Sequence, residues 1–486
     1  MADDQHSGLQ QALEGRLPVL PHERIYTRYG SLLWTTAVLS AASYAYLVGG
    51  ALAAVGNTRL AIAGYLVGLI VGELVVVLAV GVQSYRVGVD TVDAAKSALG
   101  IRGAGLILAG VLATCLGWAY VLVAMTAEGI GSLTRVVIGP SQHSQSIVIG
   151  AALVIIGAVW LLVRRGPAAM ERLSRLCAPG QIAIAAILLV VLMSKYGAET
   201  IWAHSAPATE EQLAVRLMQL AFGIEFGFAN ALSVLPYLGG LARLVRHRHH
   251  LVGPTVLGSG IVGAWFIAAV AALAAATEGN GETATWILAL AGPLGGSAVV
   301  AFLLVANLGT LVVQIYVGAV AAQQVRWIAG LRWDWILVLA LLPGVLLAFR
   351  TQWLLAHVGT WLGYNGVMFV GLAGVMVTDY FLMRRQRIEL AHLFARPGQG
   401  SYWFVGGVNW PAMLAIVVAG TLYLSLFNPV TLTADPSFRF CGAGIPAVIV
   451  AAVCYWLATR LTVAFWPAMP TRHAPNGKRR TLEIGI

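Results

Sequence analysis

Apolar segments long enough to cross a lipid bilayer recur along the whole chain, and they restrict its fold more than any other feature. A spanning helix needs about 20 mostly apolar residues, and about twelve such segments are present. Only 10% of the residues are charged, against roughly 25% in a soluble domain. The sequence therefore predicts an all-α polytopic membrane protein with about 12 transmembrane helices. The predicted spans are 31–55, 60–82, 104–127, 146–163, 177–194, 213–238, 252–276, 294–322, 333–349, 355–383, 408–427 and 442–464.

The distribution of Lys and Arg predicts the orientation of these spans. If the N-terminus is inside, most of the 30 basic residues fall in the two ends of the chain and in the loops after even-numbered spans. Short cytoplasmic loops carry such an excess. We therefore expect an integral protein of the plasma (inner) membrane with both termini cytoplasmic: an arm at 1–28, a loop at 384–407 and a tail at 465–486. No apolar run precedes the first span, so we expect no signal peptide there.

Other functional classes have little support in the sequence. The net charge of +10 resides in short loops, which argues against a nucleic-acid partner. The four cysteines form no CxxC pair, and the cluster Arg246–His250 has no cysteine or carboxylate beside it, so neither predicts a metal site. The chain has no HExxH motif, nucleophile elbow or phosphate loop. We therefore expect a protein that is not an enzyme and needs no cofactor. A passive channel is not favoured either, because it would show a polar stripe in repeated helices, whereas the polar groups here cluster at two interrupted spans.

One span contains groups that a plain membrane anchor would avoid. The stretch Phe222–Pro236 holds two glycines, a carboxylate, an amide, a hydroxyl and a proline. Irregular backbone at membrane depth is tolerated where it is buried in protein or lines a cavity, and an ionisable group there marks a functional site by default. The stretch is interpreted as a broken helix that lines a substrate pathway. The polar and helix-breaking residues are Gly223, Glu225, Gly227, Asn230, Ser233 and Pro236.

The first span contains a similar interruption. The run Ser43–Leu52 includes Gly49 and Gly50 and resembles Leu235–Leu241 of the sixth span, which also carries a Gly-Gly pair after a tyrosine. Interrupted spans at matching places, five spans apart, are typical of inverted repeats with the binding site between them. The sequence thus predicts a site formed by spans 1 and 6.

Several further stretches, taken in order, resemble the nucleobase:cation symporter-1 family of cytosine, purine, uracil, thiamine, allantoin and hydantoin permeases. The resemblance is nearest to cytosine-permease-like members, and it extends over roughly residues 30–460. The stretches that carry it are Gly49–Gly50, Leu99–Gly103, Gly117–Trp118, Gly309–Tyr316, Asp379–Arg385 and Gly406–Ala412.

This resemblance implies a five-plus-five inverted-repeat fold of the leucine-transporter type with two peripheral helices. The first repeat would occupy 29–194, the second 213–383, and the peripheral spans 11 and 12 the region 408–464. It also implies a symporter that imports a nucleobase or related flat nitrogen heterocycle by alternating access, coupled to H⁺ or Na⁺. A cation symporter of the same fold for amino acids or other small metabolites stays open as an alternative. The oligomeric state cannot be predicted.

The resemblance also assigns roles to individual residues of the expected binding site. Trp118 and Phe228 would stack on the two faces of the ring, and Gln314 would bind its edge. A stacked base is worth about 1–3 kcal/mol, and an amide matches a ring edge that bears both C=O and N–H. Ser43, Asn230 and Glu225, in the two interrupted spans, complete the expected substrate-binding set.

The expected cation-coupling residues are Glu225, Thr310, Ala42 and Glu73. Span 8 keeps one hydroxyl, Thr310, but has Gly309 where the family usually places a second, which weakens the case for Na⁺. Burial would favour the protonated form of Glu225, so we hypothesise that Glu225 carries or senses a coupling proton, with Glu73 as a second candidate. Near the cytoplasmic end, Asp379 lies beside Arg384 and Arg385 in the sequence and is expected to form a structural ion pair or a gate.

Overall fold

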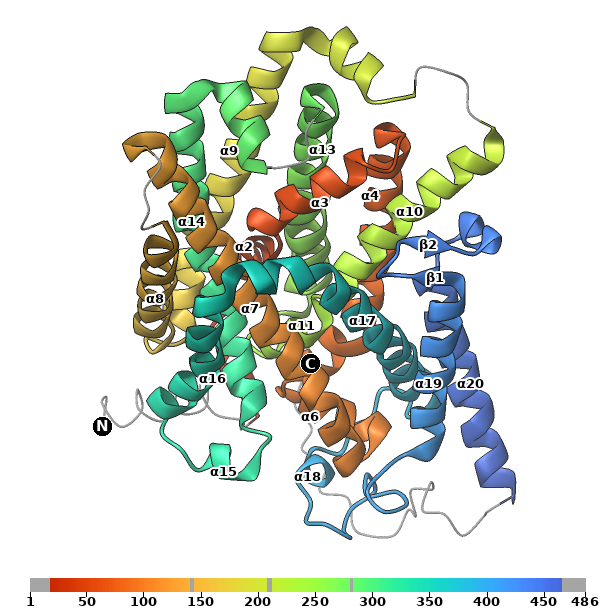
Figure 1. Cartoon of the computed structure of the whole chain (residues 1–486). Helices are drawn as coiled ribbons and strands as arrows, with labels where there is room; N and C mark the ends of the chain where they lie inside the picture. Colours follow the sequence, from red (N-terminus) through yellow and green to blue (C-terminus); the bar gives the residue numbers. More distant parts are fainter. Residues whose placement is uncertain (1–17, 140–143, 208–211, 280–282, 466–486) are drawn as a thin grey trace.

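The computed structural model of the chain describes residues 18–139, 144–207, 212–279 and 283–465 (Figure 1). Within these ranges the protein is almost entirely helical, and its regular strands form one short antiparallel hairpin. Except for residue 465, the expected tail at 465–486 lies outside the described residues, and so does most of the expected arm at 1–28. The all-α class expected from the sequence is confirmed.

The helices follow one another closely along the chain. In the first half they are α2 (Tyr29–Ser40), α3 (Ser43–Ala53), α4 (Thr58–Val76), the π-helix η2 (Val77–Gly81), α5 (Val82–Val87), α6 (Thr91–Leu99), α7 (Ile101–Ile138), α8 (Ser144–Val163) and α9 (Pro167–His204). In the second half they are α10 (Leu213–Leu232), α11 (Leu235–Ala242), α12 (Val252–Thr255), the π-helix η4 (Val256–Trp265), α13 (Phe266–Glu278), α14 (Thr283–Ala322), α16 (Trp333–Leu347), α17 (Thr351–Val377), the π-helix η6 (Thr378–Met383), α19 (Trp410–Leu426) and α20 (Gly444–Phe465).

These helices match the predicted spans well. Nine stretches of the described chain are long and apolar enough to cross a membrane, and two bent helix pairs raise the count to 11. The apolar α19 is shorter than this test requires and lies at predicted span 11. The total is consistent with about twelve spans.

The two bent pairs are the interruptions expected in spans 1 and 6. Between α2 and α3 the chain bends by 58° at Ala41 and Ala42, and between α10 and α11 it bends by 41° next to Pro236. Proline in the first turn of a helix has no N–H to leave unpaired, so α11 can start there. Both breaks lie in the interior of the molecule, where other helices surround them (Figure 1).

Glycines hold α10 against α4 along most of its length. A Cβ atom on Gly68 would lie 2.0 Å from the Ile224 carbonyl oxygen, and one on Gly227 would lie 2.2 Å from the Tyr65 carbonyl oxygen. Small residues four apart let two membrane helices approach until their backbones touch. Gly223 and Gly227 therefore lie within a regular helix and serve close packing, and the break itself comes later, at 233–234.

The last two spans are peripheral to this core. In Figure 1, α19 and α20 lie side by side against α17, on the opposite side of the molecule from α8 and α9. The hairpin of β1 (Phe427–Asn428) and β2 (Thr433–Ala434) connects them. This position agrees with the two peripheral helices expected from the sequence.

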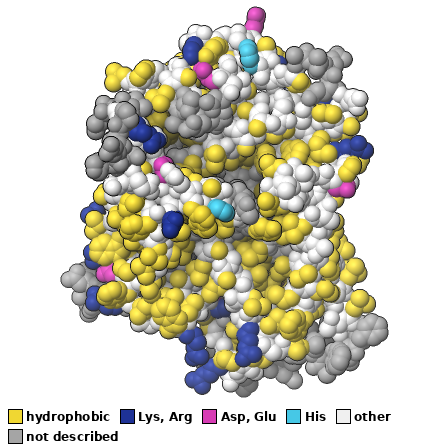
Figure 2. All heavy atoms as spheres, viewed as in Figure 1, with side chains coloured by type: hydrophobic (Ala, Val, Ile, Leu, Met, Phe, Trp, Pro, Cys, Tyr) yellow, Lys and Arg dark blue, Asp and Glu magenta, His cyan; other side chains and the backbone are white. Residues whose placement is uncertain are grey.

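The expected ion pair at the end of span 10 is present. The guanidinium of Arg384 donates to Asp379 from 2.6 Å, and the Tyr455 hydroxyl donates to the other carboxylate oxygen from 2.8 Å. Asp379 thereby connects η6 to α20. On the face shown in Figure 2, Lys and Arg side chains gather most densely at the lower end, next to the short helices α15 (Arg326–Ala329) and α18 (Leu390–Leu393) of Figure 1.

Candidate substrate site

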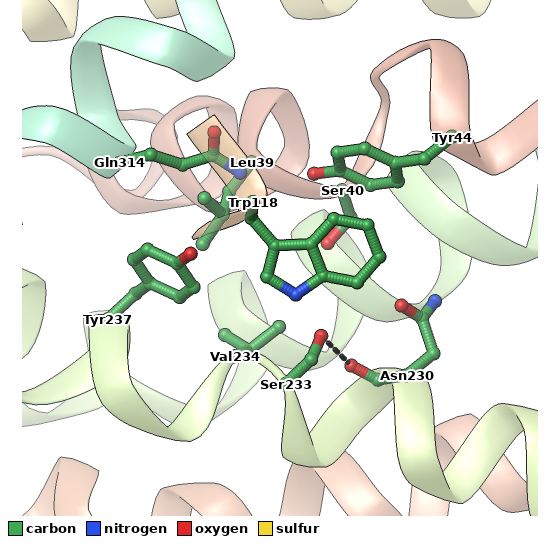
Figure 3. A pocket seen from close by; sticks show the side chains of 9 residues that line it. All are labelled: Leu39, Ser40, Tyr44, Trp118, Asn230, Ser233, Val234, Tyr237 and Gln314. Carbon is green, nitrogen blue, oxygen red and sulfur yellow. Dashed lines mark hydrogen bonds between the residues drawn. The ribbon is translucent and has the colours of Figure 1, made fainter. Parts of the chain in front are cut away.

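A small pocket lies where the two broken spans meet helices α7 and α14 (Figure 3). The broken spans line it with the end of α2, the start of α3, the end of α10 and the start of α11. The sequence predicted a site between spans 1 and 6, and this is where the pocket is found. Its lining residues are Leu39, Ser40, Tyr44, Trp118, Asn230, Ser233, Val234, Tyr237 and Gln314.

Aromatic rings form one wall of the pocket. The indole of Trp118 lies in the middle of the lining residues, and its ring centroid is 5.0 Å from that of Tyr44 (Figure 3). Behind it, the ring of Trp361 meets Trp118 edge to face at 5.3 Å. Tyr237 lines another side, and its hydroxyl donates to the Thr114 carbonyl from 3.1 Å. These contacts fix the ring planes before any ligand binds.

Two buried polar atoms of the pocket residues have no hydrogen-bond partner within the described chain. They are the amide oxygen Oε1 of Gln314, whose residue is 1% exposed, and the indole nitrogen Nε1 of Trp118. A buried polar group without a partner costs about 1–3 kcal/mol. An acceptor and a donor left free in one pocket are therefore matched to a ligand that offers both N–H and C=O.

Asn230 and Ser233 of the pocket are already bonded to protein. Asn230 Nδ2 donates to the Tyr65 hydroxyl from 2.6 Å, and the Ser233 hydroxyl donates to the Asn230 carbonyl from 2.6 Å. Both bonds hold the end of α10 at the break. The lining residues carry no Asp, Glu, Lys or Arg side chain. The pocket is thus polar and aromatic but uncharged.

The pocket is closed in this structure. Its volume is about 10 Å³, close to the least that holds one water molecule. On the side towards α6, the Thr91 hydroxyl lies 2.9 Å from the Pro236 carbonyl and accepts from the Gly239 N–H at 3.2 Å. These bonds satisfy backbone groups at the break. A ring-sized ligand requires side chains and helices around the pocket to move.

The N-terminus of α6 is capped by Asp90, in the connection after α5. Its carboxylate accepts from the Asp93 N–H at 2.7 Å. Burial, and then the nearby Asp93 carboxylate, raises the pKa of Asp90 to about 6. The helix whose Thr91 binds the α11 backbone therefore begins at a group that titrates in the mildly acidic range.

Two expected substrate residues, Phe228 and Glu225, lie on another face of α10. The Phe228 ring packs where a Cβ on Gly444 would lie 2.5 Å away, and Glu225 Oε2 accepts from the N–H groups of Ala443 and Gly444 at 2.7 and 2.9 Å. Residues three apart share a helix face, so 225 and 228 face α20 together while Asn230 and Ser233 face the pocket. In this conformation neither Phe228 nor Glu225 lines the pocket.

The remaining expected residues lie near the break of the first span. Ser43, just after Ala42, is held by Asn307 of α14: its N–H donates to Asn307 Oδ1 (3.1 Å) and its hydroxyl accepts from Asn307 Nδ2 (2.8 Å). Ala42 is fully buried in extended backbone at the start of α3. Thr310 donates its hydroxyl proton to the Val38 carbonyl from 2.5 Å. These residues bring α14 against the break but do not line the pocket.

The position of the missing span 8 hydroxyl is closed off by α2 and α9. A Cβ on Gly309 would lie 2.8 Å from Val38 Cγ2 and 2.9 Å from the Cys177 Cβ atom, so no room is left there for a second hydroxyl side chain. Within the described chain no group of three His, Cys, Asp or Glu side chains could hold a metal ion. As possible oxygen ligands for a cation, this region thus offers the Thr310 hydroxyl and the carbonyls at the end of α2.

Tyr44 and Tyr237 are the aromatic lining residues that the sequence analysis did not select. Each follows the break of its own span, and both occur in the two runs whose similarity indicated inverted repeats. The repeated tyrosine was the signal that could have identified them.

A family model for permeases of cytosine/purines, uracil, thiamine and allantoin matches residues 27–443. The chain belongs to this family. A curated relative, a hydantoin permease of Microbacterium maritypicum, is 47% identical over 58 residues; this match spans 12% of the chain and 11% of the permease. The family is one of membrane permeases and not of enzymes, as the sequence predicted.

Solved structures show the same fold. Mhp1, a nucleobase-cation-symport-1 family transporter in a closed conformation with bromovinylhydantoin bound, is similar with a TM-score of 0.73 at 16% identity, covering 95% of this chain and 97% of Mhp1. A Na⁺-coupled sialic acid symporter is similar with a TM-score of 0.60 at 11% identity, over 94% of this chain and 91% of the other. The expected leucine-transporter-like architecture is confirmed.

Proposed function

We propose that the protein imports a flat, uncharged nitrogen heterocycle of the cytosine, purine, hydantoin or allantoin type. One observation carries this proposal: the pocket pairs an aromatic wall, Trp118 and Tyr44, with two unpaired polar atoms and no charged side chain. A neutral ring stacks on the wall, and one of its N–H groups donates to the free Gln314 acceptor. The hydantoin bound to Mhp1 and the partial match to a hydantoin permease are consistent with this class of ligand.

Individual residues take the following roles in this proposal. Trp118 stacks on one face of the ring, with Tyr44 and Tyr237 at its borders. The Gln314 carbonyl oxygen accepts from a ring N–H, and Asn230 lies at the opposite end of the pocket (Figure 3). Ser43 and Phe228 act indirectly, because Ser43 fixes the break through Asn307 and Phe228 packs α10 against α20.

We also propose that transport takes place in a plasma (inner) membrane with both termini in the cytoplasm, as the Lys and Arg distribution favours. The repeats at 29–194 and 213–383 move against each other around the pocket, and a gradient of H⁺ or Na⁺ drives uptake. Opening is required because the closed pocket has room for about one water molecule. Thr310 and Ala42 lie beside the α2 break, where movement of α14 changes their environment.

An amino-acid symporter of the same fold is the second candidate. Such a ligand carries a carboxylate and an ammonium group, and the lining side chains provide a charge partner for neither. The pocket chemistry therefore favours the neutral ring.

Counterflow uptake in proteoliposomes tests the proposal without assuming a coupling ion. The panel is cytosine, uracil, a purine, allantoin, a 5-substituted hydantoin and a mixture of amino acids. We expect exchange of at least one heterocycle and none of the amino acids, with affinity lowered by Gln314→Leu. The lipid-facing Gly157→Ala is the matched control, since a Cβ there meets nothing within 4 Å. Exchange of amino acids alone would contradict the proposal.

A further inference from the structure

Besides Glu225, a second glutamate, Glu73, is buried in the middle of the membrane core, away from the pocket lining. It is 0% exposed, on the face of α4 that packs against η4. A Cβ on its neighbour Gly72 would lie 2.6 Å from the Cβ atom of Ala231. Glu73 is therefore at the depth of the α10–α11 break. Its Oε2 atom has no hydrogen-bond partner among the described residues.

The geometry around Ser259 determines where a proton must lie. Ser259 Oγ is 2.5 Å from Glu73 Oε1 and 2.9 Å from the Thr255 carbonyl oxygen. A serine hydroxyl has one hydrogen, and a carbonyl oxygen only accepts. If Glu73 is a carboxylate, both neighbours are acceptors and the hydroxyl can donate fully to one of them. If Glu73 is protonated, it donates to Ser259, which donates to Thr255. Both short contacts are then satisfied.

No positive charge compensates Glu73. Within the described part of the chain it forms no ion pair, and the titratable group that interacts with it electrostatically is the Tyr65 hydroxyl. The elements packed against α4 carry the charged or titratable groups Arg216, Glu225, Glu278, His357 and the tyrosines Tyr44, Tyr46 and Tyr364, of which Tyr364 is exposed.

None of those groups is bonded to Glu73. Glu225 accepts from backbone at the start of α20, and Glu278 accepts from Lys195 and Tyr196. Arg216 and His357 are exposed. An uncompensated buried charge is expensive, and such a group neutralises by binding a proton. The lack of a positive partner and the hydrogen-bond count therefore both indicate that Glu73 is protonated.

Glu73 is also connected to the pocket and lies close to two π-helical segments. Tyr65, two turns earlier on the same helix face, accepts from Asn230, which lines the pocket. One turn after Glu73 the chain enters the π-helix η2, and Ser259 lies within the π-helix η4. Such π-helical segments are rare and are often found at functional sites.

We propose that Glu73, with Ser259 as its hydrogen-bond partner, is the proton-carrying site that couples transport to a pH gradient. This inference rests on the proposed import function and chooses H⁺ as its coupling ion. The proton sits on Glu73 in the closed form and leaves when α4 and η4 separate and water reaches the carboxyl group. Glu225 is a structural group, because two backbone N–H donors point at one of its oxygens in this packing.

The test compares Glu73→Gln with the wild type in proteoliposomes. A glutamine amide donates to Ser259 as the protonated acid does, so the variant mimics permanent protonation and retains the packing. We expect counterflow exchange within about twofold of wild type, but pH-driven accumulation falling to the equilibrium ratio of 1. Ser259→Ala should weaken the pH response in the same direction. The matched control Glu278→Gln, at the C-terminal end of α13, should keep the pH-driven accumulation.

Accumulation by Glu73→Gln that still follows the pH gradient would overturn the inference, and so would wild-type accumulation driven by Na⁺ at equal pH. A second readout needs no substrate: at neutral pH the wild type should show the infrared carbonyl band of a protonated carboxylic acid, and Glu73→Gln should lose it. An unchanged band also overturns the assignment. If no heterocycle exchanges in the wild type, the import function fails, and the infrared result still decides the state of Glu73.

Discussion

Replacing Gly227 with alanine should destabilise the protein although it adds a single methyl group. In the structure that methyl carbon would lie 2.2 Å from the backbone oxygen of Tyr65 and 2.7 Å from the Leu69 nitrogen. Ordinary contacts begin at 3.4 Å, so α10 and α4 must separate by about 1 Å at this point. Backbone atoms cannot rotate away as a side chain can. Gly68→Ala should act in the same way, since its Cβ would lie 2.0 Å from the Ile224 oxygen.

The expected cost follows from the behaviour of overpacked cores, which lose about 1–3 kcal/mol per added group. Alanine is also the better helix former by about 1 kcal/mol, which offsets part of this loss. We therefore expect the apparent melting temperature of the detergent-solubilised protein to fall by several degrees for either variant. Combining Gly68→Ala with Gly227→Ala should cost less than the sum, because the first separation of the helices accommodates the second methyl group.

The matched controls are Gly157→Ala and Gly150→Ala in α8, where an added Cβ meets nothing within 4 Å. These substitutions should leave the melting temperature unchanged or raise it, through helix propensity alone. If Gly227→Ala melts like the two controls, the close contact between α4 and α10 is not present in the protein.

Three further predictions follow from the site and its surroundings. Trp118→Ala should weaken ligand binding by about 1–3 kcal/mol, roughly 5- to 150-fold in Kd, while Trp118→Phe keeps most of the affinity; binding titrations measure both. Glu225→Gln should lower the melting temperature, because two charge-assisted bonds to α20 become neutral at a cost of about 1–2 kcal/mol, and should leave the pH dependence of transport intact. The pKa of Asp90 is about 6 in the folded protein, against 3.8 for an ordinary aspartate, so the folded protein holds this proton more tightly than the unfolded chain. The stability gained from this tighter binding is complete below about pH 4 and is lost as the pH rises through about 6. Asp90→Asn retains the helix cap and should remove that part of the dependence, as melting curves at several pH values will show.

The sequence was sufficient to predict the spans, their two breaks and the pocket between them. Apolar length and basic loops predict spans and orientation independently of tertiary structure. The pocket contains Trp118, Asn230 and Gln314, which were predicted from the sequence. The cation-coupling assignments stay predictions.

The sequence was not sufficient to predict which way α10 faces. A membrane helix is apolar on every side, since lipid and protein interior are equally apolar, so no amphipathic pattern reveals its rotation. Phe228 and Glu225 are close to Asn230 in sequence but face α20. The same ambiguity applies to Gly223 and Gly227, which the sequence suggested as part of a break and which instead pack against α4.

The most direct test of the proposed function is the binding and counterflow of heterocycles by wild type and Trp118→Ala in the same proteoliposomes. We expect saturable exchange of a neutral ring with N–H and C=O at its edge. Trp118→Ala should weaken this exchange at least about fivefold, while Gly157→Ala should match the wild type. Equal exchange by wild type and Trp118→Ala would contradict the assignment of the pocket.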